Sequence, residues 1–209
     1  MKPCAVAWDI DGTLVDSEPL HLRALLATCL SFGADLSDLP ADEFLGIHMA
    51  DVWLRVRTRL PAGLEETVWL DAINRFYVER QGELVEMPGA VKTVRALADM
   101  RIRQACVSNS ERVIVNANLN ALGIAEAIEF SISFDDVTKG KPSAEPYLLA
   151  AKQFGAPPHE ILAVEDSEAG LASATAAGLY AVGFQCVGAP RIEADHIVCD
   201  LSGILDFFA

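Results

Sequence analysis

The stretch AVAWDIDGT, residues 5–13, contains the strongest indication of the fold. An apolar run leads directly into two carboxylates, Asp9 and Asp11, and then into a glycine. Such a run predicts a buried strand that ends in a tight turn. A calcium-binding loop does not fit, because Leu14 and Leu20 stand where that loop requires glycine and glutamate. The segment therefore predicts a strand whose carboxyl end presents two acidic side chains.

From residue 88 onward, short apolar runs alternate with helical patterns. We expect strands at 103–107, 130–134, 161–164, 180–184 and 196–198, and helices that start near residues 90, 112, 144 and 168. This alternation predicts βαβ units and a parallel sheet with helices on both faces.

Residues 16–86 differ in texture, because they contain helical patterns and no β-rich run. Ser17 is a suitable N-cap for a first helix, and further helices are expected at 51–59 and 65–80. We therefore predict an α/β protein in two parts. A Rossmann-like core with a parallel sheet comprises 1–15 and 87–209, and an all-helical cap domain, 16–86, is inserted after the first strand.

The composition excludes several classes of partner. The chain has 30 acidic against 16 basic residues and a net charge of −14, which argues against nucleic acid as a ligand. Its apolar runs are far shorter than the roughly 20 residues of a membrane span, and its start does not resemble a signal peptide. The odd number of cysteines, five, has no close spacing. We expect a cytoplasmic protein, a monomer or weak homodimer, without membrane contact.

Polar side chains follow each of the other central strands. Ser108 and Asn109 follow the strand at 103–107, Lys141 comes after the next strand, and Glu165 and Asp166 end the strand at 161–164. Each pattern alone fits a turn or a helix cap. Ligands of open parallel sheets bind at the carboxyl ends of the strands, so we expect these residues to surround one site together with the first two aspartates.

The charges of that site indicate its ligand. Four carboxylates at close range, with a single ammonium among them, cannot all ionise unless a further cation binds to them. All-oxygen ligands favour Mg²⁺ over softer metals, and Mg²⁺ commonly binds a substrate phosphate. A divalent ion with Lys141 and Ser108 would therefore make a receptor for the phosphoryl group of a small phosphorylated metabolite.

The motifs resemble those of the haloacid dehalogenase superfamily. Residues 9–18, DIDGTLVDSE, are similar to its first motif. Ser108, Lys141 and the pair Glu165 and Asp166 match its second, third and fourth motifs in order. The helical insertion resembles the cap of the subfamily that contains phosphoglycolate phosphatases, sugar-phosphate phosphatases and β-phosphoglucomutase.

The resemblance implies roles for the acidic residues. Asp9 would be the nucleophile that forms an aspartyl-phosphate. Asp11 would protonate the leaving group and then activate water. Asp9, the main-chain carbonyl of Asp11, and Asp166 would hold Mg²⁺, with Glu165 in support.

The resemblance also implies contacts with the substrate. Ser108, Asn109 and Lys141 would orient the phosphoryl oxygens and neutralise their charge. A loop of the cap faces the active site in relatives, and here it would contain Gly46 and His48. We expect the activity to be hydrolysis of a sugar phosphate or sugar-acid phosphate.

Two alternatives remain open. A phosphosugar mutase of the β-phosphoglucomutase type would have a lysine three residues after Ser108, where this chain has Glu111 followed by Arg112. A non-catalytic regulator on the same fold would usually lack an aspartate of the first motif, and this chain has both.

Three further cap side chains are candidates for substrate contact. His21 lies in the first cap helix, and Arg55 and Arg59 are spaced to share a helix face. A role at the site and an ordinary solvated face are both open for these three.

Overall fold

The computed structural model describes residues 3–44, 47, 49–185 and 192–209 of the chain. The chain divides into two compact units, one of Met1–Asp16 with Val85–Ala209 and one of Ser17–Leu84. These limits lie within two residues of the predicted domain boundaries. Among the described residues, no helix combines the length and the apolar character needed to cross a bilayer.

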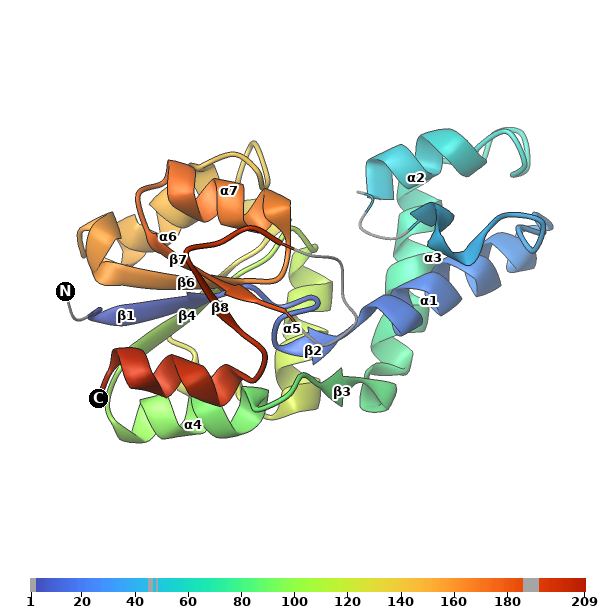
Figure 1. Ribbon diagram of the computed structural model, residues 1–209. Helices are drawn as coiled ribbons and strands as arrows, with labels where there is room; N and C mark the ends of the chain where they lie inside the picture. The colour runs from blue at the N-terminus through green and yellow to red at the C-terminus, as the bar shows by residue number, and fades with distance from the viewer. Residues whose placement is uncertain (1–2, 45–46, 48, 186–191) are drawn as a thin grey trace. The chain divides into compact units, whose positions relative to one another are not determined.

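The larger unit is built on a six-stranded sheet with the order β5-β4-β1-β6-β7-β8 (Figure 1). Every neighbouring pair of strands is parallel, which confirms the predicted sheet. The strands are β1 (Ala5–Trp8), β4 (Arg103–Val107), β5 (Phe130–Ile132), β6 (Ile161–Glu165), β7 (Tyr180–Phe184) and β8 (His196–Val198).

Helices cover both faces of this sheet. Figure 1 shows α6 and α7 on one side and α4 with the C-terminal helix η6 on the other. The α-helices of the unit are α4 (Ala90–Asp99), α5 (Arg112–Leu122), α6 (Glu145–Phe154) and α7 (Glu168–Ala176). Short 3-10 helices are η3 (Ala125–Ala127), η4 (Phe134–Asp136), η5 (Pro158–Glu160) and η6 (Leu201–Phe207).

The alternation of side chains along β1 directs them to two different layers. Ala5 and Ala7 are fully buried with Tyr147 and Phe154 of α6, and their small size lets this helix approach the sheet closely. The next residue, Trp8, faces the opposite layer, where its Nε1 donates to Gln104 Oε1 at 3.0 Å. Gln104 in turn donates to a main-chain carbonyl of α4. The centre of the sheet is therefore fixed by packing from both sides.

A second, two-stranded sheet lies where the chain leaves and re-enters this unit. β2 (Val15–Asp16) pairs antiparallel with β3 (Val85–Glu86). The sequence did not predict it, since each strand is only two residues long and shows no periodic pattern.

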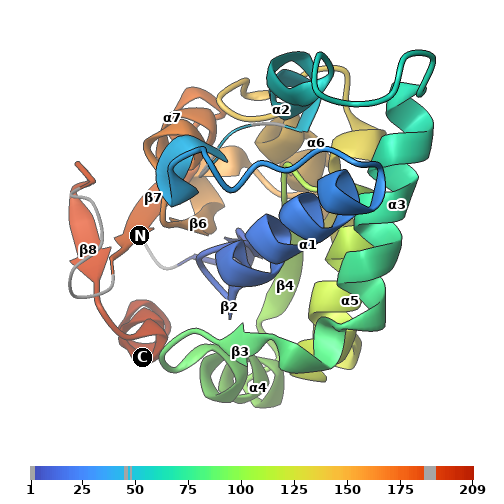
Figure 2. The same ribbon diagram turned by 90° about the vertical axis from the view of Figure 1, so that its right-hand side faces the viewer.

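Every regular element in the described residues of the smaller unit is a helix, in line with the all-helical cap that the sequence predicts. It contains α1 (Glu18–Ser31), η1 (Ala41–Phe44), α2 (Met49–Val56), α3 (Glu66–Glu79) and η2 (Gln81–Glu83). Within it, α1 and α3 pack side by side (Figure 2). Trp69 of α3 is fully buried, donates to Cys29 Sγ at 3.4 Å, and contacts the Trp53 ring at 5.3 Å between centroids. Trp69 thus lies in the core of this unit, and the half-buried Trp53 packs against it.

The structure differs from three local predictions in detail. Ser17 is the N-cap residue of α1, as predicted, but its side chain makes no capping hydrogen bond, and its backbone is helical where a capping residue is usually extended. The strand expected at 130–134 ends at Ile132, because Ser133 and Asp136 form a capping box that starts η4. The helix expected at 51–59 ends at Val56.

Candidate active site

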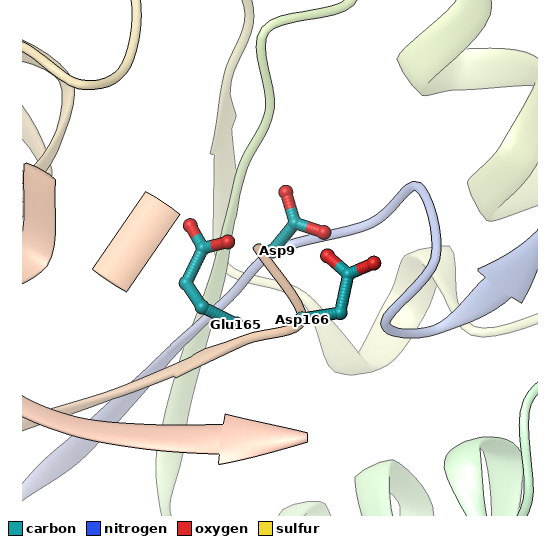
Figure 3. A group of neighbouring side chains, drawn as sticks. All are labelled: Asp9, Glu165 and Asp166. Carbon is teal, nitrogen blue, oxygen red and sulfur yellow. The ribbon is translucent and has the colours of Figure 1, made fainter. Parts of the chain in front are cut away.

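Three carboxylates converge where β1 and β6 end, at the centre of the sheet. Asp9 follows β1, Glu165 is the last residue of β6, and Asp166 comes next. One oxygen of each lies within 4.8 Å of an oxygen of both others. Figure 3 shows the three side chains pointing to the same side of the strand ends. The parallel sheet therefore brings together acids that are more than 150 residues apart, as the sequence predicted.

Lys141 provides the positive charge of this cluster. Its Nζ lies 2.6 Å from Asp9 Oδ1, 2.6 Å from Glu165 Oε1 and 2.7 Å from the carbonyl of Val107, and its side chain is only 4% exposed. Burial alone would lower the pKa of Lys141, but the charges of Asp9 and Glu165 outweigh burial and raise it. The ammonium therefore stays protonated and links the two carboxylates.

One lysine does not balance three acids, of which Asp9 and Glu165 are buried and Asp166 is half-buried. Burial is the largest cause that raises the pKa of Glu165 to about 8 and that of Asp166 to about 7, and the charge of Asp9 adds to both. Burial likewise raises the pKa of Asp9. Within the described residues, Asp9 Oδ2 and Glu165 Oε2 are buried without a hydrogen-bond partner. Carboxylate oxygens without a hydrogen-bond partner, in a cluster with excess negative charge, are suitable ligands for a hard divalent cation such as Mg²⁺.

Two glycines make room for this cluster. A Cβ on Gly12 would lie 2.1 Å from Asp166 Oδ2, and Gly12 has a φ of +85°, which side chains rarely adopt. A Cβ on Gly170 of α7 would lie 1.8 Å from Glu165 Oε2. The hydroxyl of Tyr147 donates to the other oxygen of Glu165. Gly170 and Tyr147 could not be recognised from the sequence, since a glycine in a helix and a tyrosine on an apolar stripe carry no local signal.

The side chain of Asp11 has its own set of partners. Its Oδ2 accepts hydrogen bonds from Ser108 Oγ at 3.0 Å and Ser110 Oγ at 2.8 Å, and its Oδ1 accepts one from Asn118 Nδ2 at 2.9 Å. The carboxylate of Asp11 is not one of the three in the cluster that could hold a metal ion. Ser108 was expected to orient a phosphoryl group, and in this structure its hydroxyl contacts Asp11. Ser110 and Asn118 were not found from the sequence.

Asn109 supports the loop that carries Lys141. Its Nδ2 donates to the carbonyl of Lys141 at 3.1 Å, and its Oδ1 accepts from the amide of Lys141 at 2.7 Å. Both ends of the amide therefore bind main chain. Asn109 was expected to contact substrate, and in this structure its side chain fixes the backbone of the lysine.

Arg112 begins α5 next to this site. Its guanidinium donates to Ser131 and forms an ion pair with Asp136. These partners belong to β5 and η4, which follow α5, so the side chain of Arg112 is bound within the core unit.

The two cap arginines that are candidates for substrate contact have other partners within their own unit. Arg55 forms an ion pair with Glu43 at 2.9 Å, and Arg59 donates to Asp38 at 2.9 Å. Arg59 lies beyond the end of α2, so the two arginines do not share a helix face.

The ring of His21 lies 4.4 Å from that of Tyr77. Gly46 and His48 were expected to contact substrate, and both lie outside the described residues.

Comparison with known proteins identifies the family. The family model of haloacid dehalogenase-like hydrolases matches residues 5–178, which include all four strand-end motifs. The chain belongs to the haloacid dehalogenase-like hydrolases. The resemblance in the sequence motifs is thereby confirmed.

Individual relatives within this family are similar over most of their length. Hexitol phosphatase A of Escherichia coli is 29% identical over 202 residues, which cover 94% of this chain and 91% of the relative. The protein CbbY of Rhodobacter capsulatus is 31% identical over 193 residues, covering 87% and 85%. A crystal structure of CbbY from Rhodobacter sphaeroides with xylulose-1,5-bisphosphate superposes with a TM-score of 0.85 at 25% identity, covering 97% and 96% of the two chains.

Proposed function

We propose that this haloacid dehalogenase-like hydrolase is a Mg²⁺-dependent phosphatase. It hydrolyses a small phosphate monoester, a sugar phosphate or sugar-acid phosphate, through an aspartyl-phosphate on Asp9. The observation that carries the proposal is the buried pairing of Asp9 with Lys141 beside Asp166, where the other Asp9 oxygen has no hydrogen-bond partner among the described residues. The similarity to hexitol phosphatase A supports the class of substrate.

The chemistry proceeds in two displacements at phosphorus. In the first, a carboxylate oxygen of Asp9 attacks, the bond from phosphorus to the ester oxygen breaks, and Asp11 gives its proton to the departing oxygen. In the second, water attacks the aspartyl-phosphate, Asp11 takes the water proton, and the Asp9 carboxylate is released with inorganic phosphate. Lys141 remains charged throughout and offsets the negative charge that gathers around Asp9.

Asp9, Asp166 and the main-chain carbonyl of Asp11 would hold Mg²⁺, with Glu165 in support. The ion would neutralise the excess carboxylate charge and polarise the phosphoryl group. Glu165 also has a second task, since it anchors Lys141.

The core unit offers little to a second phosphate group. A phosphosugar mutase needs a cation for that group, and this chain has Glu111 at the position of the mutase lysine. The neighbouring Arg112 is already paired with Asp136 and Ser131. We therefore favour hydrolysis of a monophosphate over the mutase alternative. A purely regulatory role is not favoured, because both aspartates of the first motif are retained.

Phosphate release from sugar, sugar-acid and nucleoside monophosphates, measured with and without Mg²⁺, tests the proposal. We expect Mg²⁺-dependent release from sugar or sugar-acid phosphates, and loss of turnover in excess EDTA. Asp9→Asn should abolish turnover while the protein stays folded, and Asp99→Asn, an exposed aspartate of α4, is the matched control. Turnover by Asp9→Asn, or full activity without a divalent ion, would refute the mechanism.

A further inference from the structure

Asn118 is a polar side chain in an unusual place. It lies in the middle of α5, is fully buried, and its helix neighbours Val115 and Leu119 are buried apolar residues. Burying an amide is costly unless its hydrogen bonds are satisfied. The same helix exposes two other asparagines, Asn116 and Asn120, which need no such explanation. A specific partner must therefore account for Asn118.

That partner is the carboxylate of Asp11, 107 residues earlier in the chain. Asn118 Nδ2 donates to Asp11 Oδ1 at 2.9 Å. The hydroxyls of Ser108 and Ser110, from the loop before α5, donate to Oδ2. Donors from two different segments thus hold the two oxygens and fix the plane of the carboxylate.

We infer that Asn118 is a positioning residue that orients Asp11 for proton transfer. The inference rests on the proposed phosphatase function, in which Asp11 gives a proton to the leaving group and later takes one from water. General acid–base catalysis requires the proton donor to lie within hydrogen-bonding reach of the reacting oxygen, and small misplacements cost much of its effect. The buried amide prevents rotation of the carboxylate away from that position.

The chemistry of the amide suits both protonation states of Asp11. Its NH₂ group can donate to Asp11 in both states, because a protonated carboxyl group keeps a carbonyl oxygen that accepts a hydrogen bond. The amide itself neither gains nor loses a proton during turnover. A carboxylate or an ammonium at this position would instead favour one protonation state of Asp11.

The test compares two leaving groups in single turnover with enzyme in excess. One substrate is the alkyl monophosphate that the wild type hydrolyses best, whose alkoxide must be protonated as it leaves. The other is p-nitrophenyl phosphate, whose stable phenolate leaves without a proton. We expect Asn118→Leu to slow phosphoryl transfer from the alkyl phosphate by about tenfold to a hundredfold. Release of p-nitrophenolate should change by less than about threefold, since it does not depend on Asp11.

The controls separate positioning from folding. Asn116→Leu and Asn120→Leu, on the exposed side of the same helix, should leave both rates unchanged. Asn118→Asp keeps the side-chain shape but replaces the donor by a carboxylate, and it should show the same selective loss. Melting temperatures establish which variants are folded.

Each outcome decides the question. An equal loss with both substrates, or wild-type rates in a folded Asn118 variant, would overturn the inference while the phosphatase function stands. Failure of both Asn118 variants to fold, with both control variants folded, would show that Asn118 has a structural role only. A wild type that hydrolyses no monophosphate would overturn the proposed function, and the inference would fall with it.

Discussion

Tyr147→Phe isolates the contribution of one buried hydrogen bond to the site. The hydroxyl of Tyr147 donates to Glu165, which is fully buried and holds Lys141 with the same oxygen. The second oxygen of Glu165 has no partner among the described residues. The substitution removes a single oxygen atom and leaves the ring packing in place. A change in the free energy of unfolding is therefore due to the lost hydrogen bond and not to a cavity.

The expected magnitude follows from the state of Glu165. A hydrogen bond to an ionised group contributes about 1.5–3 kcal/mol to the free energy of unfolding. For a domain of this size that corresponds to a melting temperature lower by about 3–12 °C. The raised pKa of Glu165, about 8 against a normal 4.5, means that the wild type loses stability as the pH rises through this interval. Loss of the donor raises this pKa further, so the variant should lose more stability at pH 9 than at pH 6.

Thermal unfolding in EDTA at these two pH values provides the measurement. The pKa of Tyr147 is raised by burial and by the charge of Glu165, so the phenol keeps its proton at pH 9. Tyr180→Phe is the matched control, because Tyr180 is 39% exposed on β7, and its melting temperature should hardly change. If Tyr147→Phe unfolds at the same temperature as this control at pH 9, the reasoning about the buried carboxylate is wrong.

Two further predictions concern the carboxylate cluster of Asp9, Glu165 and Asp166. Mg²⁺ should raise the melting temperature more at pH 8 than at pH 5.5. The reason is that protons compete with the ion for Glu165 and Asp166, whose pKa values are raised to about 8 and 7. An equal shift of the melting temperature at both pH values, measured by differential scanning fluorimetry, would contradict this prediction. Gly12→Ala should abolish both phosphate release and the stabilisation by Mg²⁺, because the new methyl group meets Asp166 at 2.1 Å. The control is Gly33→Ala, because Gly33 has the same φ of +85° but open space around it. This substitution should cost only about 1–2 kcal/mol of backbone strain, and the variant should still be stabilised by Mg²⁺. Loss of the stabilisation by Mg²⁺ in both variants would refute the steric argument.

The parts of the site at strand ends could be predicted from the sequence. Parallel strands all end at one edge of the sheet, so the order of strands and motifs was enough to bring Asp9, Lys141 and Asp166 together. No side-chain detail was needed for this step, because the topology fixes the edge. The sheet and its inserted helical unit followed from the change of hydrophobic periodicity along the chain.

The parts of the site that depend on side-chain direction could not be predicted. Nothing local marks Asn118, since its role depends on Asp11, which lies 107 residues earlier in the sequence. Asn109 lies beside the motif serine and was expected at the substrate, but its amide binds the backbone of Lys141. Glu165 was expected chiefly at the metal, and the distance to Nζ reveals its ion pair with Lys141.

The short β2–β3 ladder has a consequence for how this enzyme class can diversify. Asp16 and Val85 are paired across that ladder, so the chain departs from the core and returns to it at adjacent points. An insert that is joined to the core through such a pair of strands can change in length or be exchanged in evolution, while the two points where it joins the core remain paired. Selection for a new metabolite can then act on the module between them, and the phosphorus chemistry is inherited unchanged.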